Sequence, residues 1–150
     1  MRQAIYLQLV LIGLCFALLY YPVFFKLIQT WEADADYSHG YFIPFIAGFM
    51  VWTMREQLQR IEWRPNNWGL IVVFLGVLQL IVAWIGSEYF LQGTSMILVL
   101  IGVALFMLGT EAAKRLLVPI AYLVFMIPLP AIIWNQAAFP LALFASKASA

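Results

Sequence analysis

Charged residues divide the chain into long uncharged stretches of the length that a membrane helix needs. Asp, Glu, Lys and Arg are absent from residues 3–25, 37–54, 65–87, 89–110 and 116–146. A bilayer core about 30 Å thick requires roughly 20 helical residues. The first four stretches therefore fit one span each. The last stretch is too long for one span and is broken by Pro128 and Pro130.

The positions of charges, prolines and turn residues within these stretches predict about five transmembrane helices. Their expected bounds are residues 4–25, 40–54, 68–85, 94–108 and 116–129. Pro22 and Lys26 are expected to end the first helix, and residues 87–93 and 110–115 are expected to be connections. The predicted fold class is therefore all-α, a polytopic helical membrane protein.

The segment after these spans is harder to assign. Pro128-Leu129-Pro130 predicts an extended break, because each proline disfavours helix in the residue before it. Non-helical backbone at membrane depth survives only against protein or a wet cavity. The break therefore indicates a cavity near Asn135 and Gln136, with a plain interfacial loop as the alternative. Pro140 is expected to interrupt the run from Ala131 to Ser146, which leaves a re-entrant, an interfacial or a sixth helix open.

Composition supports a bilayer environment and a single unit. The chain is 65% hydrophobic and 10% charged, whereas a soluble domain is usually about 25% charged. The net charge is +1 and no basic cluster suggests nucleic acid as a partner. Repeats and soluble segments are absent, so residues 1–150 are expected to form one transmembrane domain in contact with the lipid bilayer.

The distribution of the eight Lys and Arg residues predicts the orientation. Placing the N-terminus in the cytoplasm puts most of them on the cytoplasmic side, as the positive-inside rule favours. These residues are Arg2, Arg55, Arg60, Arg64, Lys114 and Arg115. Lys26 then lies on the outer side and Lys147 stays unassigned. In this orientation residues 32–39, 87–93 and 128–136 share the extracytoplasmic face.

The tract Asp36-Tyr37-Ser38-His39-Gly40 holds the sole histidine beside the second predicted span. A histidine can act as acid or base near neutral pH, and ionisable groups near membrane depth are often functional. The alternative is that His39 caps the next helix or bonds a loop carbonyl. Asp36 can orient the ring as a carboxylate does in a triad, or it can simply complement a helix N-terminus. Gly40 is expected to permit a tight turn.

The remaining candidates for chemistry favour structural roles. Glu32, Asp34 and Asp36 lack the ligand pattern of a calcium loop, so we expect a solvated acidic loop and no metal site. Cys15, the single cysteine, lies in the middle of the first predicted span. We expect it to be a small core residue, and one His with one such Cys cannot make a zinc site. No cofactor-binding motif is present.

These arguments predict a cleft at the extracytoplasmic face, formed by the histidine tract and the proline-rich break. Its candidate lining residues are Tyr37, Ser38, His39, Gly40, Pro128, Pro130, Asn135 and Gln136.

Two motifs in this order resemble the exosortase/archaeosortase family. The first comprises Trp31 and the run Asp36-Tyr37-Ser38-His39-Gly40-Tyr41-Phe42-Ile43-Pro44. The second is Met126-Ile127-Pro128-Leu129-Pro130 together with the later run Phe139-Pro140-Leu141-Ala142-Leu143-Phe144-Ala145-Ser146. The resemblance covers the whole chain and corresponds to the N-terminal portion of the family.

The resemblance implies a multi-pass protein of the bacterial inner (cytoplasmic) membrane, in a family with about eight spans. Such proteins are cysteine transpeptidases that process exported proteins bearing a C-terminal hydrophobic sorting tail, in connection with extracellular polysaccharide. The family's catalytic Cys, Arg and His come after the segment matched by Ser146. No catalytic residue is therefore expected in this chain, which is expected to be inactive alone.

Two alternatives remain open from the sequence. A proton-coupled membrane transporter would use His39, Asp36 and Glu88 as a relay, which requires a carboxylate facing an intramembrane site. The second alternative is that the chain is a non-catalytic membrane subunit.

Overall fold

The computed structural model describes residues 2–149, and the described chain is almost entirely helical. Its elements are α1 (Arg2–Ala33), η1 (Ala35–Tyr41), α2 (Phe42–Thr53), α3 (Arg55–Arg60), α4 (Trp68–Ile85), α5 (Tyr89–Leu108), α6 (Thr110–Tyr122), η2 (Leu123–Met126) and α7 (Ala131–Ala148), where η denotes a 3₁₀ helix. The predicted all-α fold class is confirmed.

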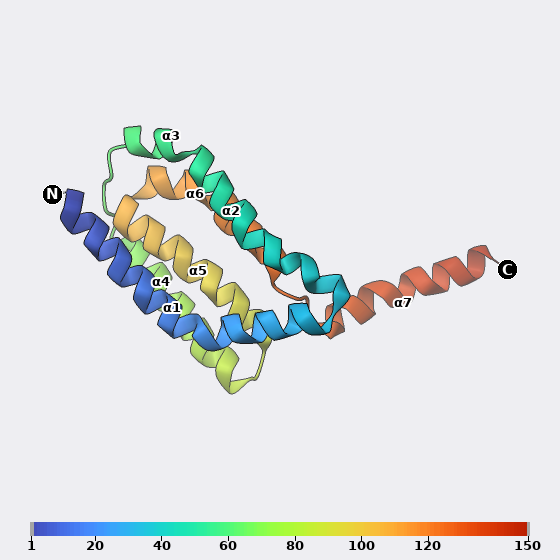
Figure 1. Cartoon of the computed structure of the whole chain (residues 1–150). Helices are drawn as coiled ribbons and strands as arrows, with labels where there is room; N and C mark the ends of the chain where they lie inside the picture. Colours follow the sequence, from blue (N-terminus) through green and yellow to red (C-terminus); the bar gives the residue numbers. More distant parts are fainter. Residues whose placement is uncertain (1, 150) are drawn as a thin grey trace.

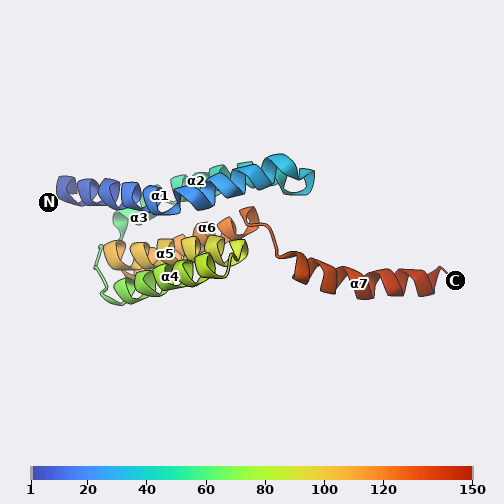
Figure 2. The same cartoon turned by 90° about the horizontal axis from the view of Figure 1, so that it is seen from below.

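The helices form a bundle from which α7 projects (Figure 1). Figure 2 shows α1 and α2 in one layer and α4, α5 and α6 in a second. We call one end of the bundle the η1 end; it holds η1, the α4–α5 turn and η2. We call the opposite end the α3 end; it holds the start of α1, α3 and the α5–α6 junction, where Asn66 Nδ2 donates to Thr110 Oγ1 over 3.0 Å.

Helices α4 and α5 form the most closely packed pair, and glycines at their contact explain the close approach. A Cβ added to Gly102 would lie 2.7 Å from the backbone nitrogen of Val73, and one added to Gly69 would overlap the backbone of Phe106. Small residues let membrane helices approach until their backbones touch. This antiparallel hairpin is therefore specified by the glycine spacing in the two helices.

The main hydrophobic cluster shows why α1 is longer than predicted. Tyr20, Val23, Leu27 and Trp31 are all buried and recur at the spacing of one helix face. The prediction that α1 ends near Pro22 is wrong, since the helix continues through this proline to Ala33. Burial of Leu27 and Trp31 against the cluster outweighs the backbone hydrogen bond that the proline removes.

Three helices are long and apolar enough to cross a bilayer: residues Gln3–Ala33, α4 and α5. Helix α2 has 12 residues and α6 has 13, both short of the roughly 20 that a bilayer core needs. The second and fifth predicted spans are therefore not confirmed as full spans and stay predictions.

Two predicted connections are helical in the structure. Helix α5 begins at Tyr89 rather than Thr94, because its polar first turns pack inward, with Gln92 and Ser95 both buried. Residues 110–115 form the amphipathic start of α6, in which Ala112 and Ala113 are buried while the neighbouring charges face outward. Polar residues at both places were mistaken for loops because their apolar neighbours form only one face of a helix.

The last element is one continuous helix, so the prediction that Pro140 interrupts it is wrong. A proline inside a helix removes one hydrogen bond, and the helical residues on both sides maintain the element. Residues 135–148 of α7 are all exposed, as are Ile132 and Ile133. Its assignment as a re-entrant, interfacial or sixth helix stays a prediction.

The predicted burial of Cys15 is also wrong, since this side chain is exposed on α1. Many large apolar side chains of the spanning helices share this exposure, for example Leu14 at 59% and Phe74 at 67%. Apolar residues cover a membrane helix on all sides, so hydrophobicity alone does not identify which side faces the protein.

Candidate functional site

The histidine tract forms the 3₁₀ helix η1, which begins at an aspartate cap. The Asp34 carboxylate accepts a hydrogen bond from the backbone N–H of Asp36 over 3.0 Å. The Ser38 hydroxyl donates to the carbonyl of Ala35 over 2.7 Å. Short side chains that bond the nearby backbone favour such tight turns. The segment predicted to be a solvated acidic loop is therefore an ordered element, and Asp34 serves to start it.

His39 is held in a defined orientation at the exposed surface of η1. Its Nδ1 lies 2.9 Å from the backbone carbonyl oxygen of Asp36. A carbonyl only accepts hydrogen bonds, so Nδ1 carries the proton of the neutral ring, and Nε2 retains its lone pair. Asp36 thus orients the ring through its backbone rather than through its carboxylate. Because Nδ1 is bonded to a loop carbonyl, Nε2 is the ring nitrogen left for a hydrogen bond with another group.

A tryptophan joins η1 to the segment before the proline-rich break. Trp31 is buried, and its Nε1 donates to the backbone carbonyl of Met126 over 2.9 Å. The Trp31 indole lies so close to Gly40 that a Cβ there would overlap it. Gly40 is therefore needed for close approach of the indole rather than for the tight turn that we predicted. The Tyr41 ring completes the contact edge-on to Trp31, with centroids 5.0 Å apart.

One titratable side chain near η1 has a pKa that is shifted by its surroundings. Desolvation, together with the nearby Glu32 carboxylate, raises the pKa of the Tyr41 hydroxyl above its ordinary value. The phenol therefore stays protonated and remains a hydrogen-bond donor. Within residues 2–149, no three His, Cys, Asp or Glu side chains come together as metal ligands.

The structure places the predicted cleft residues on two parts of the molecule. Tyr37 is half-buried against the main cluster, Ser38 and His39 are exposed, and Gly40 is buried. Pro128 and Pro130 are half-buried in the connection after η2, to which η1 is tied by Trp31.

The remaining two cleft residues, Asn135 and Gln136, are exposed on α7. Figure 2 shows that helix leaving the bundle, on the side of the second layer. A shared cleft that includes them stays a prediction.

Sequence analysis missed a groove beside these residues at the η1 end. Its volume is about 490 Å³, and its lining comes from α1, the end of α4, the α4–α5 turn and the start of α5. The lining residues are Tyr21, Pro22, Phe25, Lys26, Gln29, Trp84, Ser87, Tyr89 and Gln92. A small extension with Lys26, Tyr89 and Gln92 in its wall reaches Pro128. One feature of the sequence could have indicated this groove: Lys26 is a basic residue predicted on the outer side, whereas six other basic residues are predicted on the cytoplasmic side.

A second cavity lies within the bundle and is almost wholly apolar. Its volume is about 280 Å³, and its walls come from α1, α2, α5, α6 and η2. Ala47 and Gly48 are its smallest lining residues, and Phe16, Met96 and Met126 are among its larger ones.

The one thiol of the chain is far from His39. Cys15 lies in the apolar middle of α1, whereas His39 comes after the end of that helix at Ala33. A helical rise of about 1.5 Å per residue separates Cys15 from that end by on the order of 25 Å. The two side chains cannot form a nucleophile–base pair.

Comparison with known protein families identifies a match over most of the chain. The sequence model of the transmembrane exosortase family matches residues 31–150, from Trp31 through η1, the bundle and α7. No curated protein and no solved structure matches the chain.

Proposed function

Because the chain belongs to the transmembrane exosortase family, we propose that it forms the substrate-facing part of a membrane cysteine transpeptidase. The substrates are exported proteins that carry a C-terminal hydrophobic sorting tail, and their processing serves extracellular polysaccharide production. The membrane is the bacterial inner membrane, with the N-terminus in the cytoplasm and the η1 end outside.

The observation that carries this proposal is the physical connection between the two family motifs. Trp31 at the start of the first motif donates its indole N–H to the carbonyl of Met126 at the start of the second. Gly40, within the first motif, provides the space that the indole needs. Residues about ninety positions apart therefore form one unit at one end of the bundle, as expected for two parts of a single site.

The orientation is argued from the charges at the two ends. Arg55, Arg60 and Arg64 belong to α3 and the loop after it, and Lys114 and Arg115 lie in the first turns of α6 at the same α3 end. An excess of Lys and Arg favours the cytoplasmic side. The η1 end then faces the compartment that exported substrates enter.

In the proposed reaction a cysteine thiolate adds to a peptide carbonyl of the substrate. The C–N bond breaks, a general acid gives its proton to the leaving amine, and a thioester remains for transfer to an acceptor nucleophile. Cys15 does not supply this thiolate, because it lies in the apolar middle of α1. His39 would line the cleft with its Nε2 available to hydrogen-bond the substrate.

The apolar cavity suits the hydrophobic tail of such a substrate. Its walls carry almost no polar surface, and both Pro44 and Met126 of the two family motifs line it. An apolar tail that enters from the bilayer would therefore meet the cavity close to the η1 end. The placement explains how a tail and a peptide bond could be held by the same unit.

A proton-coupled transporter finds less support. All seven Asp and Glu side chains are exposed, and Asp36 and Glu88 lie in η1 and before α5 rather than within a span. A relay through the membrane needs an ionisable group inside the bundle.

Photocrosslinking tests the proposal. A photoreactive residue is placed at His39, or at Gln59 on α3 as the matched control, in cells that export a reporter with a sorting tail. We expect the His39 position to capture the reporter, and capture to fall when the sequence of its sorting tail is scrambled. Capture from Gln59 alone, or equal capture of the scrambled tail, contradicts the proposal.

A further inference from the structure

The groove at the η1 end contains a cation without an acidic partner. Lys26 is the basic residue that α1 brings to this end, and its Nζ lies 3.4 Å from the centroid of the Tyr89 ring. The ion pairs found in residues 2–149 join Arg64 to Glu62 and Lys114 to Glu111. The Lys26 charge is therefore balanced only by the face of an aromatic ring, which leaves it available to an anion.

The polar side chains in the lining of the groove are all able to donate hydrogen bonds. Gln29 and Ser87 present an amide and a hydroxyl, and the buried Gln92 uses one N–H for the carbonyl of Ala83 at 3.4 Å. Glu88 precedes Tyr89, yet no Asp or Glu belongs to the described lining. A carboxylate-free set of donors around one ammonium group suits an oxygen-rich anion.

Ser87 occupies an unusual conformation at this place. Its φ is +55°, the left-handed region in which glycine is normally preferred. This conformation ends α4, because the N–H of Glu88 donates to the carbonyl of Ala83 over 3.0 Å and the N–H of Ser87 donates to the carbonyl of Trp84 over 3.3 Å. The end of α4 thereby turns the chain at Ser87, a residue whose hydroxyl belongs to the lining of the groove.

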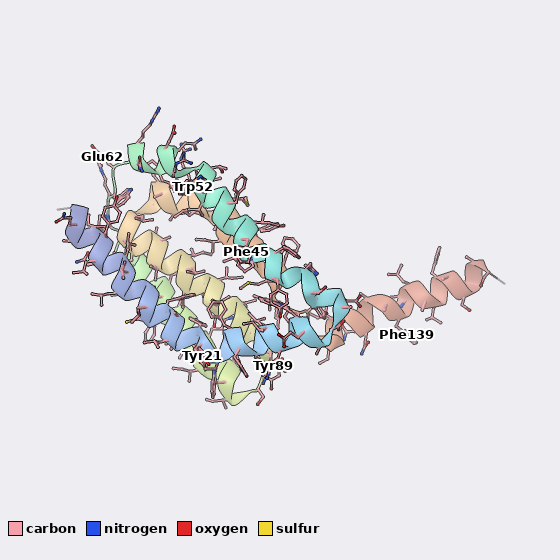
Figure 3. All side chains as sticks on the ribbon, viewed as in Figure 1. Tyr21, Phe45, Trp52, Glu62, Tyr89 and Phe139 are labelled. Carbon is pink, nitrogen blue, oxygen red and sulfur yellow. The ribbon has the colours of Figure 1, made fainter. Side chains whose placement is uncertain are left out.

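The rest of the groove is apolar, and it lies where the candidate spans α4 and α5 meet, between Ile85 and Tyr89. Pro22, Phe25 and Trp84 form its apolar walls. Figure 3 shows Tyr21 and Tyr89 at the same part of the bundle, where α1 meets the start of α5. Tryptophan and tyrosine gather where lipid headgroups meet hydrocarbon. A volume of about 490 Å³ is within the usual size of a ligand site.

We propose that this groove binds the phosphate diester of an anionic phospholipid in the leaflet at the η1 end, with Lys26 as its cation. The ammonium group and the Ser87 and Gln29 donors hold the phosphate, and the walls at Pro22, Phe25 and Trp84 contact the glycerol and upper acyl carbons. A free phosphate ion would share the donors but would make no use of these apolar walls, so the lipid is the better fit.

Native mass spectrometry of the purified chain in a neutral detergent, titrated with short-chain phosphatidylglycerol, tests this site. Lys26→Met is compared with Lys114→Met, which removes the same charge at the α3 end. We expect about tenfold weaker binding for Lys26→Met, the size of a lost hydrogen bond to a charged group, and unchanged binding for Lys114→Met. Equal loss in both variants, or no loss in Lys26→Met, overturns the proposal.

Two further arms identify the ligand. Zwitterionic phosphatidylcholine is expected to bind clearly more weakly than phosphatidylglycerol, and inorganic phosphate is expected not to displace the bound lipid. Displacement by phosphate at comparable concentration would indicate a site for a soluble anion and overturn the assignment.

If Lys26→Met does not fold, Ser87→Gly decides the question. Glycine suits the left-handed backbone, so this variant keeps the fold while losing the hydroxyl. We expect about threefold weaker lipid binding from one lost hydrogen bond. Binding as tight as that of the parent chain overturns the proposal.

Discussion

Helices α5 and α7 have similar lengths, 20 and 18 residues, and opposite surroundings. Helix α5 buries small, polar and apolar residues against its neighbours, including Gly93, Ser95 and Gly102. Every described side chain of α7 is exposed, Phe139 at 69% and Phe144 at 76% among them. Both helices are apolar, so hydrophobicity does not explain why one is buried and the other exposed.

The difference shows what fixes a helix in this bundle. Lipid and protein are about equally apolar, so burying leucine or phenylalanine gives little preference for one neighbour over another. Close contact of small residues and internal hydrogen bonds supply the preference instead. Helix α5 has both, with Gly102 against α4 and Ser95 Oγ 3.2 Å from Tyr20 Oη of α1. Such contacts are not found for α7 in the described chain.

The largest effect is expected where the glycine contact of α5 is filled. Gly102→Leu places a side chain against the backbone of Val73, and overpacking of this kind costs about 3 kcal/mol. Gly13→Leu is the matched control, since a Cβ there meets nothing within 4 Å. The free energy of unfolding in mixed detergent micelles, monitored by circular dichroism, measures both. An equal loss of unfolding free energy in both variants would show that glycine packing is not what holds α5 in the bundle.

A smaller effect is expected at the junction between the family motifs. Trp31→Phe removes the indole N–H and leaves the Met126 carbonyl without its partner, which costs about 2 kcal/mol. Trp52→Phe, at a side chain that is 63% exposed on α2, should cost less than about 0.5 kcal/mol. The same unfolding measurement separates them. A Trp31→Phe chain as stable as the control would mean that the motifs are joined by other contacts.

A local effect is expected at the start of η1. Asp34→Ala removes the cap of this short helix, which is worth about 1 kcal/mol. Asp36→Ala is the control, because the hydrogen bonds of Asp36 use its backbone N–H and carbonyl. Hydrogen exchange of residues 35–41 should accelerate about fivefold in the first variant, the factor that 1 kcal/mol gives. Similar exchange in both variants would assign the order of η1 to Trp31 alone.

Much of the fold was predictable because uncharged stretches fix where helices cross a bilayer. The first span, α4 and α5 were found in this way. Helix ends were predicted less well, because a proline or a polar residue was assumed to end a helix. Leu27 and Trp31 continue the buried face of α1 past Pro22, and that spacing was visible in the sequence.

The sequence motifs of the candidate site could be identified in advance, whereas the contacts between them could not. The tract around His39 and the residues before Pro128 were identified from sequence. The hydrogen bond between Trp31 and Met126 depends on how α1 and η2 meet in space, which no local pattern encodes. The groove at Lys26 was missed for the same reason, since its walls come from α1 and from the turn between α4 and α5.

The smallest effect is expected on α7, where it completes the comparison with α5. Phe139→Ala removes a ring that is 69% exposed and makes no part of either hydrophobic cluster. The free energy of unfolding of the chain should change by less than about 0.5 kcal/mol, as is usual for surface substitutions. Ile97→Ala, at a buried side chain of α5 that is 6% exposed, should cost about 2 kcal/mol, the lower end of the usual range, because packing contacts are lost without a transfer from water. Both substitutions replace a large apolar side chain of a helix by alanine. The main difference between them is that Phe139 is exposed and Ile97 is buried. A cost for Phe139→Ala close to that for Ile97→Ala would require α7 to pack on the bundle in the membrane, and the contrast between the two helices would then be lost.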